Sequence, residues 1–551
     1  MKKYILLLAV LSGSVYISDA QNLDPTVEVT RGYKAELADA NKSSISMEVP
    51  DTVYRFDLDF DYSVFDNPYR GSYEFNPYAM DMKPQSAPYK PSWLYVNAGV
   101  GYTLHPVLDF YCSPVLNGRF GVDFSARHRS YFGDYRSADV GKTAGTKSFS
   151  NGYDIMSEAG VNLGYDWKKT AADLSVGYYG VAVKDVFHRD AFNALDASLS
   201  VKSKKHWKRG FLYDIGARYR FGGNNEIREH LMGADIKLGP LMKSKHKIFV
   251  DFGMDMAIYG KSLSATFGSG YIKPHYVYEK DRLKVDLGAR ISYVGSADEN
   301  FAVRNQYVYP DLHMSFALIR DAMRFYVDVT GGERLNTYSS ALSANHHFYS
   351  GYAVAGNALL GASVERVRPE VGFEGRITNF FTYDLKGGYV LSSGAPMEVL
   401  VRQADGLYRP ALGYVDCQQA YAQFDWNMTS RSVKVDGSVK YVHTWDVPAL
   451  GEGMYYVRPA EVVAEAAVEY NWNRRVFAGV ECSAASISRT VDAAVYVPYY
   501  VDLGVYAEYV INRKMSVWLR GGNLLDMEIQ RNPLFAEKGI NFTAGICLTL
   551  Q

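Results

Sequence analysis

The pair His346 and His347 is the feature of this 551-residue sequence with the most obvious capacity for chemistry. Two adjacent imidazoles, here beside Tyr349 and Tyr352, can contact a metal ion or a polar ligand. No carboxylate or thiol stands beside them at a metal-ligand spacing, and an adjacent histidine pair is also typical of a solvated loop. We therefore treat His346 and His347 as candidates for ligand contact, and we predict no metal or cofactor site.

No catalytic motif accompanies the histidines. The GxSxG, HExxH and P-loop patterns are absent from any context that would support catalysis. A formal net charge of −1 gives no field suited to nucleic acid. The four cysteines are too widely spaced for a metal cluster or a dense disulfide framework, so we expect isolated thiols. We predict no catalytic residues and no enzyme activity. The cysteines are Cys112, Cys417, Cys482 and Cys547.

Many charged residues lie in segments that alternate apolar and polar side chains at period two. Between residues 248 and 258, apolar side chains occupy the even positions, whereas Asp251 and Asp255 occupy odd ones. A β-strand sends successive side chains to opposite faces, so each such segment has one oily and one polar side. The same pattern occurs in 283–293, 433–441, 501–509 and 539–550.

These strands favour a membrane barrel over a soluble sandwich or propeller. The runs are long, and no motif repeats every 40 to 50 residues or so, as propeller blades would. The chain holds 45 tyrosines, which suit the two interfaces of a bilayer. A charge on the lipid face would cost about 2–4 kcal/mol at mid-bilayer, so the strand charges are predicted to face the lumen. They are Asp251, Asp255, Lys284, Asp286, Arg290, Asp436, Lys440, Asp502 and Glu508.

The connections between strands alternate in kind. Every second one is short and charged, and those between are of variable length. Outer-membrane barrels have short periplasmic turns and long extracellular loops, and closure leaves no unpaired backbone in hydrocarbon. We predict an all-β, closed, transmembrane antiparallel barrel of about 22 strands over residues 92–551. The short connections include 167–170, 204–209, 243–246, 279–282, 473–475 and 512–514, and the predicted long loops are 131–151, 297–304, 334–365, 393–412 and 526–537.

The N-terminus has the three parts of a secretory signal. Lys2 and Lys3 precede an apolar stretch, and Ser18-Asp19-Ala20 offers small residues before a cleavage point at Gln21. We predict a signal peptide over residues 1–20. Residues 21–91 are partly acidic and spotted with proline, and we predict an extended periplasmic or lumen-filling segment.

Several stretches of the chain, most of them in the predicted barrel, resemble a known family. Gly522-Asn523-Leu524-Leu525-Asp526, followed by the stretch from Lys538 to Gly545, is similar to the last hairpin of TonB-dependent outer-membrane receptors. Residues 95–102 and 31–42 resemble the TonB-receptor-like barrels of Bacteroidota. The resemblance implies a 22-stranded barrel in the cell outer membrane. The chain departs from the family in two respects: residues 21–91 show no plug pattern, and the last strand ends in Leu550-Gln551 rather than an aromatic residue.

A short segment after the cleavage point resembles a TonB box, which pairs with TonB by adding a strand. It is Thr26-Val27-Glu28-Val29-Thr30. Residues of this type are also common in a flexible arm, since all that they share is a preference for extended backbone.

Two functions follow as hypotheses. The first is a TonB-dependent receptor-like barrel for ligand binding or nutrient uptake, in contact with outer-membrane lipid and with TonB or other envelope proteins. The second is a non-transporting accessory or structural subunit of an outer-membrane complex, which the missing plug pattern favours. In both cases a barrel of this width needs filling. We predict that residues 21–91 and the inward-folded loop 334–365 occlude the lumen.

Overall fold

The computed structural model describes residues 92–102, 104–114, 118–204, 211–240, 246–296, 305–320, 322–352, 359–490 and 495–550. The chain divides into two units, Met1–Gln85 and Ser86–Gln551, and the second unit is described by itself below. The predicted signal peptide, the segment 21–91 and the TonB-box-like residues 26–30 lie outside the described ranges.

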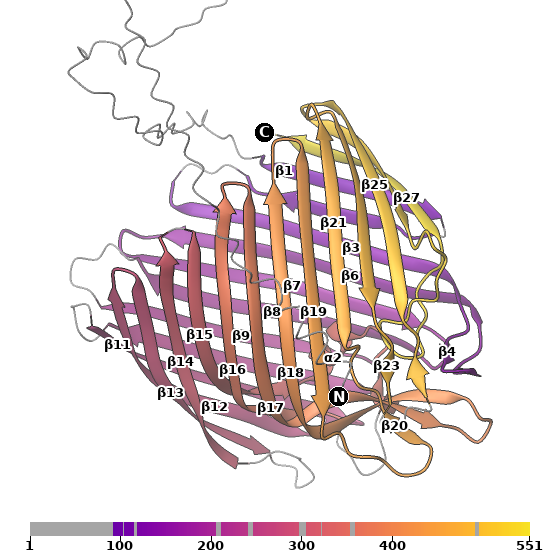
Figure 1. Ribbon diagram of the computed structural model, residues 1–551, viewed down its shortest axis with the longest axis horizontal. Coiled ribbons are helices and arrows are strands. Elements are labelled where there is room, and N and C mark those ends of the chain that lie inside the picture. The colour runs from indigo at the N-terminus through magenta and orange to yellow at the C-terminus, as the bar shows by residue number, and fades with distance from the viewer. Residues whose placement is uncertain are drawn as a thin grey trace, which may run out of the picture. The chain divides into compact units, whose positions relative to one another are not determined.

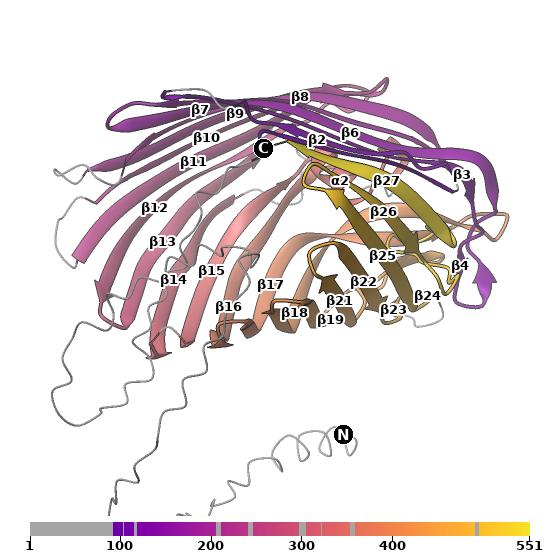
Figure 2. The same cartoon turned by 90° about the horizontal axis from the view of Figure 1, so that it is seen from above.

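The second unit is a closed antiparallel β-barrel (Figure 1 and Figure 2). Its sheet contains 23 strands, but β20 only extends β17 beyond the wall, so the wall has 22. The first and last strands close it, pairing from Leu94 with Leu550 to Tyr102 with Phe542. The predicted all-β barrel of about 22 strands is therefore confirmed. Among the described residues, no helix is long and apolar enough to cross a bilayer.

The wall strands follow one another in chain order. They are β1 Leu94–Tyr102, β2 Val107–Cys112, β3 Phe120–Tyr135, β6 Phe149–Asp166, β7 Thr170–Lys184, β8 Arg189–Ser203, β9 Leu212–Gly223, β10 Ile227–Gly239, β11 His246–Lys261, β12 Thr266–Lys280, β13 Leu283–Ser296, β14 Asn305–Ile319, β15 Met323–Asn336, β16 Gly361–Thr378, β17 Phe381–Arg402, β18 Tyr408–Thr429, β19 Val433–Trp445, β21 Val462–Trp472, β22 Val476–Ala485, β25 Tyr500–Asn512, β26 Met515–Gly522 and β27 Asn541–Leu550.

The two ends of the barrel differ in their connections. At the end that carries Leu94 and Leu550, which we call the turn end, strands are joined by turns as short as 281–282 and 513–514. At the opposite end, the loop end, several connections hold structure of their own, as the lower part of Figure 1 shows. These short elements are β4 Asp139–Val140, β5 Thr143–Ala144, α2 Tyr338–Ala344, η2 Ser350–Tyr352, β20 Met454–Tyr456, β23 Ser488–Arg489 and β24 Tyr496–Val497.

One predicted loop is wrong. Residues 393–412 belong mainly to β17 and β18, which run on as a long hairpin and are joined by 403–407. The sequence misleads because Gly394, Pro396 and Pro410 usually interrupt strands. Beyond the wall this hairpin has a small core of its own, in which Val399 and Ala411 are fully buried. Of the other predicted loops, 297–304 lies outside the described residues, and the rest fall at the loop end.

The two faces of the strands have the predicted chemistry. Met254 is 53% exposed and Leu287 44% exposed on the outer face, whereas Asp251 and Ser292 are 8% and 3% exposed on the inner one. The charges of the inner face pair with one another: Arg218 with Asp255, Arg290 with Glu333 and His275 with Asp286. Exposed aromatic side chains mark both ends, as in barrels that contact lipid. They include Tyr102, Tyr293 and Tyr441 near the loop end, and Tyr470 and Trp472 near the turn end.

A charge introduced on the outer face should destabilise the barrel. We expect Leu287→Arg to cost about 2–4 kcal/mol, because its guanidinium would enter hydrocarbon. The matched control is Asn162→Arg, which places the same side chain on the inner face of β6 beside Ser175. Urea titration in lipid vesicles, with folded protein separated by its gel mobility, measures both variants. Equal destabilisation by the two would contradict the assignment of faces.

Candidate functional site

The connection between β15 and β16 forms a structured cap. We use the name cap for its described residues, 337–352 and 359–360. Thr337 and Ser340 start α2 with reciprocal hydrogen bonds, in which each side chain accepts from the other residue's backbone N–H. Such a capping box satisfies two amide groups that a helix start leaves unpaired. A helix of two turns is therefore held at a defined point of the loop.

The cap is joined to the wall by an apolar core. Tyr338, Leu342, Phe348 and Tyr352 are all at most 3% exposed. They pack against inward-facing residues from several neighbouring strands, so the helix lies within the barrel near its loop end (Figure 1). The wall residues of this cluster are Tyr179, Val181, Val183, Phe192, Ala194, Ile227, Ala257, Tyr259, Phe267, Val294 and Ala362.

Polar contacts tie the cap to the wall and to the β17–β18 hairpin. His346 bonds to Asp154 of β6, which lies in the back wall of Figure 1. Arg409 and Tyr414, in the part of β18 that extends beyond the wall, donate to cap carbonyl oxygens at 3.1 and 3.0 Å. The cap therefore lies inside the barrel at the loop end and contacts both the wall and the β17–β18 hairpin. The described part of loop 334–365 folds inward, and its occlusion of the lumen stays a prediction.

A buried carboxylate holds two histidines at the edge of the cap. Asp185, in the turn between β7 and β8, has a side chain that is 1% exposed. The Nδ1 of His347 lies 2.7 Å from one of its oxygens, and the Nδ1 of His188 lies 3.2 Å from the other. Burial alone would raise the pKa of Asp185, but hydrogen bonds and charge from the two histidines outweigh it and lower that pKa below its usual range. Asp185 is therefore a carboxylate at neutral pH, and the stability that it contributes is lost only as the pH falls below about 4.

Ring contacts hold the same histidines. The imidazole of His347 stacks on Phe535, with ring centroids 4.2 Å apart and planes at 9°, and meets Tyr135 edge-on. That of His188 stacks on Tyr349 of the cap at 4.3 Å. The Asp185 cluster, which we define as Asp185, His188 and His347, thus fixes the cap by charge and by packing.

A second buried carboxylate lies under the start of α2. Glu229 of β10 is fully buried and accepts hydrogen bonds from the Tyr259 hydroxyl at 2.5 Å and from the backbone N–H of Ser339 at 3.2 Å. A negative charge here also faces the positive end of the helix dipole. The remaining oxygen of Glu229 has no hydrogen-bond partner in the described residues, so burying this group beneath the cap costs free energy that its two hydrogen bonds offset in part.

The structure places the predicted histidine pair in the cap and gives each imidazole a carboxylate partner. Sequence reasoning missed those partners because Asp154 and Asp185 are 192 and 162 positions away in the chain. The ligand contact of the pair stays a prediction. Among the described residues, no three His, Cys, Asp or Glu side chains are placed to bind a metal ion, and the four cysteines are free thiols, as expected.

Raising the pH should loosen the cap through His346. Burial alone would lower the pKa of His346, but its hydrogen bond and attraction to Asp154 raise that pKa above its ordinary 6.5. Because the pKa of His346 is raised, the stability that His346 contributes to the cap is complete below about pH 6.5. This stability is lost as the pH rises through the pKa of His346 in the folded protein. We expect amide exchange in residues 337–352, corrected for the pH dependence of the chemical exchange rate, to become about threefold faster between pH 6 and pH 9. A threefold change corresponds to about 0.6 kcal/mol of cap stability. In His346→Gln this pH dependence should disappear; if it persists unchanged, another group is responsible.

A polar chamber lies in the lumen along the C-terminal part of the wall. It has a volume of about 1280 Å³ and runs from Lys514 and Thr549 at the turn end to Glu537 and Lys538 near the loop end. Its walls carry acidic and basic side chains in similar number, such as Glu465, Glu508, Arg129 and Arg513. Such a chamber can hold a polar ligand or a polar segment of protein.

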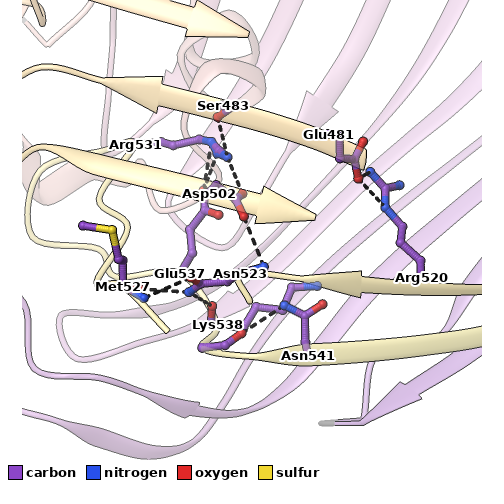
Figure 3. Close-up of polar contacts among 11 residues, drawn as sticks. Glu481, Ser483, Asp502, Arg520, Asn523, Met527, Arg531, Glu537, Lys538 and Asn541 are labelled. Carbon is purple, nitrogen blue, oxygen red and sulfur yellow. Dashed lines mark hydrogen bonds and ion pairs between the residues drawn. The ribbon is translucent and has the colours of Figure 1, made fainter. Parts of the chain in front are cut away.

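Figure 3 shows the part of this chamber next to the connection between β26 and β27, residues 523–540. Arg531 lies 2.9 Å from Asp502 and 3.4 Å from Glu537. Asn523 fixes the connection from within, since its amide donates to the carbonyl oxygens of Met527 and Lys538 at 2.8 and 3.2 Å. The polar side of this loop therefore belongs to the chamber.

The same loop also contacts the cap. Leu534, Phe535 and Ala536 are each at most 6% exposed, and Phe535 is the ring that stacks on His347. Leu534 has a φ of +73°, a strained value for a residue with a β-carbon, and it persists because the surroundings hold it. The loop 523–540 therefore connects the chamber with the cap.

The closed barrel is similar in fold to several solved structures. No protein-family model matches the chain, and no curated protein matches it. Among solved structures, the chain is similar to the copper transporter OprC, with a TM-score of 0.59 and 12% identity, over 84% of this chain and 81% of that one. It is also similar to the ferric enterobactin receptor PfeA of Pseudomonas aeruginosa, with a TM-score of 0.59 and 11% identity, over 83% and 80% of the two chains.

A third similar structure is the ferric-catecholate import receptor Fiu of E. coli K12. Its TM-score is 0.58 at 8% identity, and the match covers 84% of this chain and 82% of that one. Identities this low establish a common fold and leave ligand and mechanism open. The fold that the resemblance to TonB-dependent receptors implied is confirmed.

Proposed function

We propose that this chain is an outer-membrane barrel of the TonB-dependent receptor type, which binds a ligand or takes it up and uses the cap as its outer gate. The observation that carries the proposal is the combination of a closed cap with the polar chamber beneath it. A cap held by side-chain packing and buried ion pairs can open without unfolding the wall, because Asn336 and Gly361 at its base remain strand partners.

The remaining assignments complete this proposal. Residues 1–20 direct the chain to the envelope and are removed, the turn end faces the periplasm, and the loop end faces outward. Residues 21–91 lie in the periplasm or fill the lumen from the turn end, and residues 26–30 contact TonB. The resemblance of 31–42 and 95–102 favours a Bacteroidota source. The three solved structures are transport proteins or receptors by name, which supports a function without catalysis.

Conductance in planar bilayers tests the gate. We expect the full-length protein to be silent, and to stay silent when residues 21–91 are deleted, because the cap still closes the lumen. Replacing residues 337–360 by an Asn-Gly turn should keep the wall intact, since it joins paired strand ends with a favoured hairpin turn. Combined with the deletion of 21–91, this change should give a stable pore. A stable nanosiemens-scale pore from the full-length protein, unchanged on deleting 21–91, would contradict the proposal.

A second candidate function is an accessory barrel that does not transport. It is favoured by the amount of apolar packing over the loop end, where Leu400, Val497 and Leu534 from three connections form a further buried cluster. A barrel sealed in this way could serve as a docking surface in an outer-membrane complex.

Isolation in mild detergent separates the two functions. Stable partner proteins that remain after residues 26–30 are deleted would support the accessory barrel. A contact with TonB that disappears on this deletion would support the receptor. Scrambling the same five residues, with their composition kept, is the matched control for the deletion.

A further inference from the structure

The corner of the chamber next to loop 523–540 collects hydrogen-bond donors from both strands of the last hairpin. Arg520 of β26 pairs across the sheet with Thr543, and Gly522 pairs with Asn541. Arg520 and Asn541 are therefore diagonal neighbours on the chamber side, about 7–8 Å apart. Lys538 reaches the same corner from the loop, and Figure 3 draws it beside Asn541. Arg520, Lys538 and Asn541 all line the chamber.

Lys538 differs from the other cations of this corner in its pairing. Arg520 donates from Nε to Glu481 at 2.9 Å, and Arg531 is paired with Asp502 and Glu537. No carboxylate of the described residues lies within ion-pair distance of Lys538. Its Nζ lies 5.7 Å from the centroid of the Tyr131 ring, in a cation–π contact. Its ammonium group thus has no direct counter-charge.

The surroundings make that charge costly. Burial lowers the pKa of Lys538, and the nearby Arg520 guanidinium lowers it further, although Glu537 and Asp154 act in the opposite sense from beyond ion-pair distance. The backbone at this point is fixed, because the carbonyl of Lys538 accepts a hydrogen bond from Asn523. A cation held in place without a partner is suited to bind an anion.

We propose that this corner binds the carboxylate of a ligand, with Lys538 as the charged donor and Arg520 as the second. The ammonium supplies three donors. Arg520 donates to Glu481 from Nε and Nη2, which leaves Nη1 of its guanidinium available to a ligand. The planar array of guanidinium donors matches the geometry of a carboxylate. The proposal rests on the proposed function, since it specifies the ligand class of the chamber.

Competitive labelling of lysines tests this site. The full-length protein in detergent is treated with a water-soluble N-hydroxysuccinimide ester, and mass spectrometry follows the rate at each lysine. The probe is benzoate, with benzyl alcohol as its uncharged counterpart and sodium chloride to match the ionic strength. We expect labelling of Lys538 to become roughly threefold slower when the benzoate concentration is about twice its Kd. Lys514, which lines the same chamber at the turn end, should be unaffected.

A variant tests the second donor. Arg520→Gln should weaken protection of Lys538 by benzoate, and Arg520→Lys should restore part of it. Equal slowing of Lys538 and Lys514, equal protection by benzyl alcohol, or no protection by benzoate would each overturn the proposal. The labelling readout measures binding in the chamber and not transport, so a silent cap-deleted barrel would refute the proposed function without affecting this result.

Discussion

Replacing Asp185 by asparagine should open the cap without disturbing the barrel wall. The substitution keeps the shape of the side chain but removes the charge that two imidazoles share in a site 1% exposed. Hydrogen bonds to a charged group are worth about 1.5–3 kcal/mol, and loss of roughly 2 kcal/mol corresponds to an approximately 30-fold faster opening. Hydrogen–deuterium exchange of residues 337–352 measures this directly, because Ala341, Asn345 and Phe348 donate backbone hydrogen bonds only within the cap.

The matched control for this change is Asp173→Asn. Asp173 lies on the same hairpin, but its ion pair with Lys202 is about half exposed and near the turn end. We expect no change in cap exchange, because exposed pairs contribute little. If Asp185→Asn leaves the exchange of the cap unchanged, the Asp185 cluster does not hold the cap.

Truncating Tyr338 should have a larger effect. Tyr338 is completely buried, its ring belongs to the core between cap and wall, and its hydroxyl lies 3.3 Å from both Asp190 and the amide of Asn224. Removal of a buried aromatic ring costs about 3–5 kcal/mol. We therefore expect Tyr338→Ala to leave the cap open, with exchange of residues 337–352 more than about 100-fold faster, which is the lower end of this range.

Two further variants separate ring from hydroxyl. Tyr338→Phe keeps the packing and should cost about 1 kcal/mol, the usual worth of a hydrogen bond. Tyr499→Ala removes a tyrosine that is 56% exposed on another connection of the loop end, and should leave the cap unchanged. Equal effects of Tyr338→Ala and Tyr499→Ala would show that the cap core is not what closes the lumen.

The wall of the barrel could be predicted because its physics is local. Alternation at period two marks a strand with one lipid-facing side, and the residues from Ile248 to Ile258 or from Leu283 to Tyr293 show it without reference to the rest of the chain. The short, charged connections could likewise be recognised locally, and they indicated which end of the barrel carries the turns and which carries the loops. The hairpin 393–412 was missed because its apolar residues, such as Val399 and Ala411, pack against Tyr456, a contact made across 40 residues or more of sequence.

The site could be predicted only in part. His346 and His347 were recognised as a candidate because they are adjacent in sequence. Their partners Asp154 and Asp185 come from separate strands and turns, and Glu229 has the appearance of an ordinary lumen charge. No local pattern indicates that Phe535 stacks on His347, since that contact depends on closure of the barrel between β27 and β1.

The central claim is that the cap, and not the width of the wall, determines whether the lumen is open. Single-channel conductance of two proteins that both lack residues 21–91, one with the native cap and one with residues 337–360 replaced by Asn-Gly, tests it most directly. The account predicts a silent first protein and a stable pore from the second. A stable pore from the first protein, or silence from both when both are folded, would contradict it.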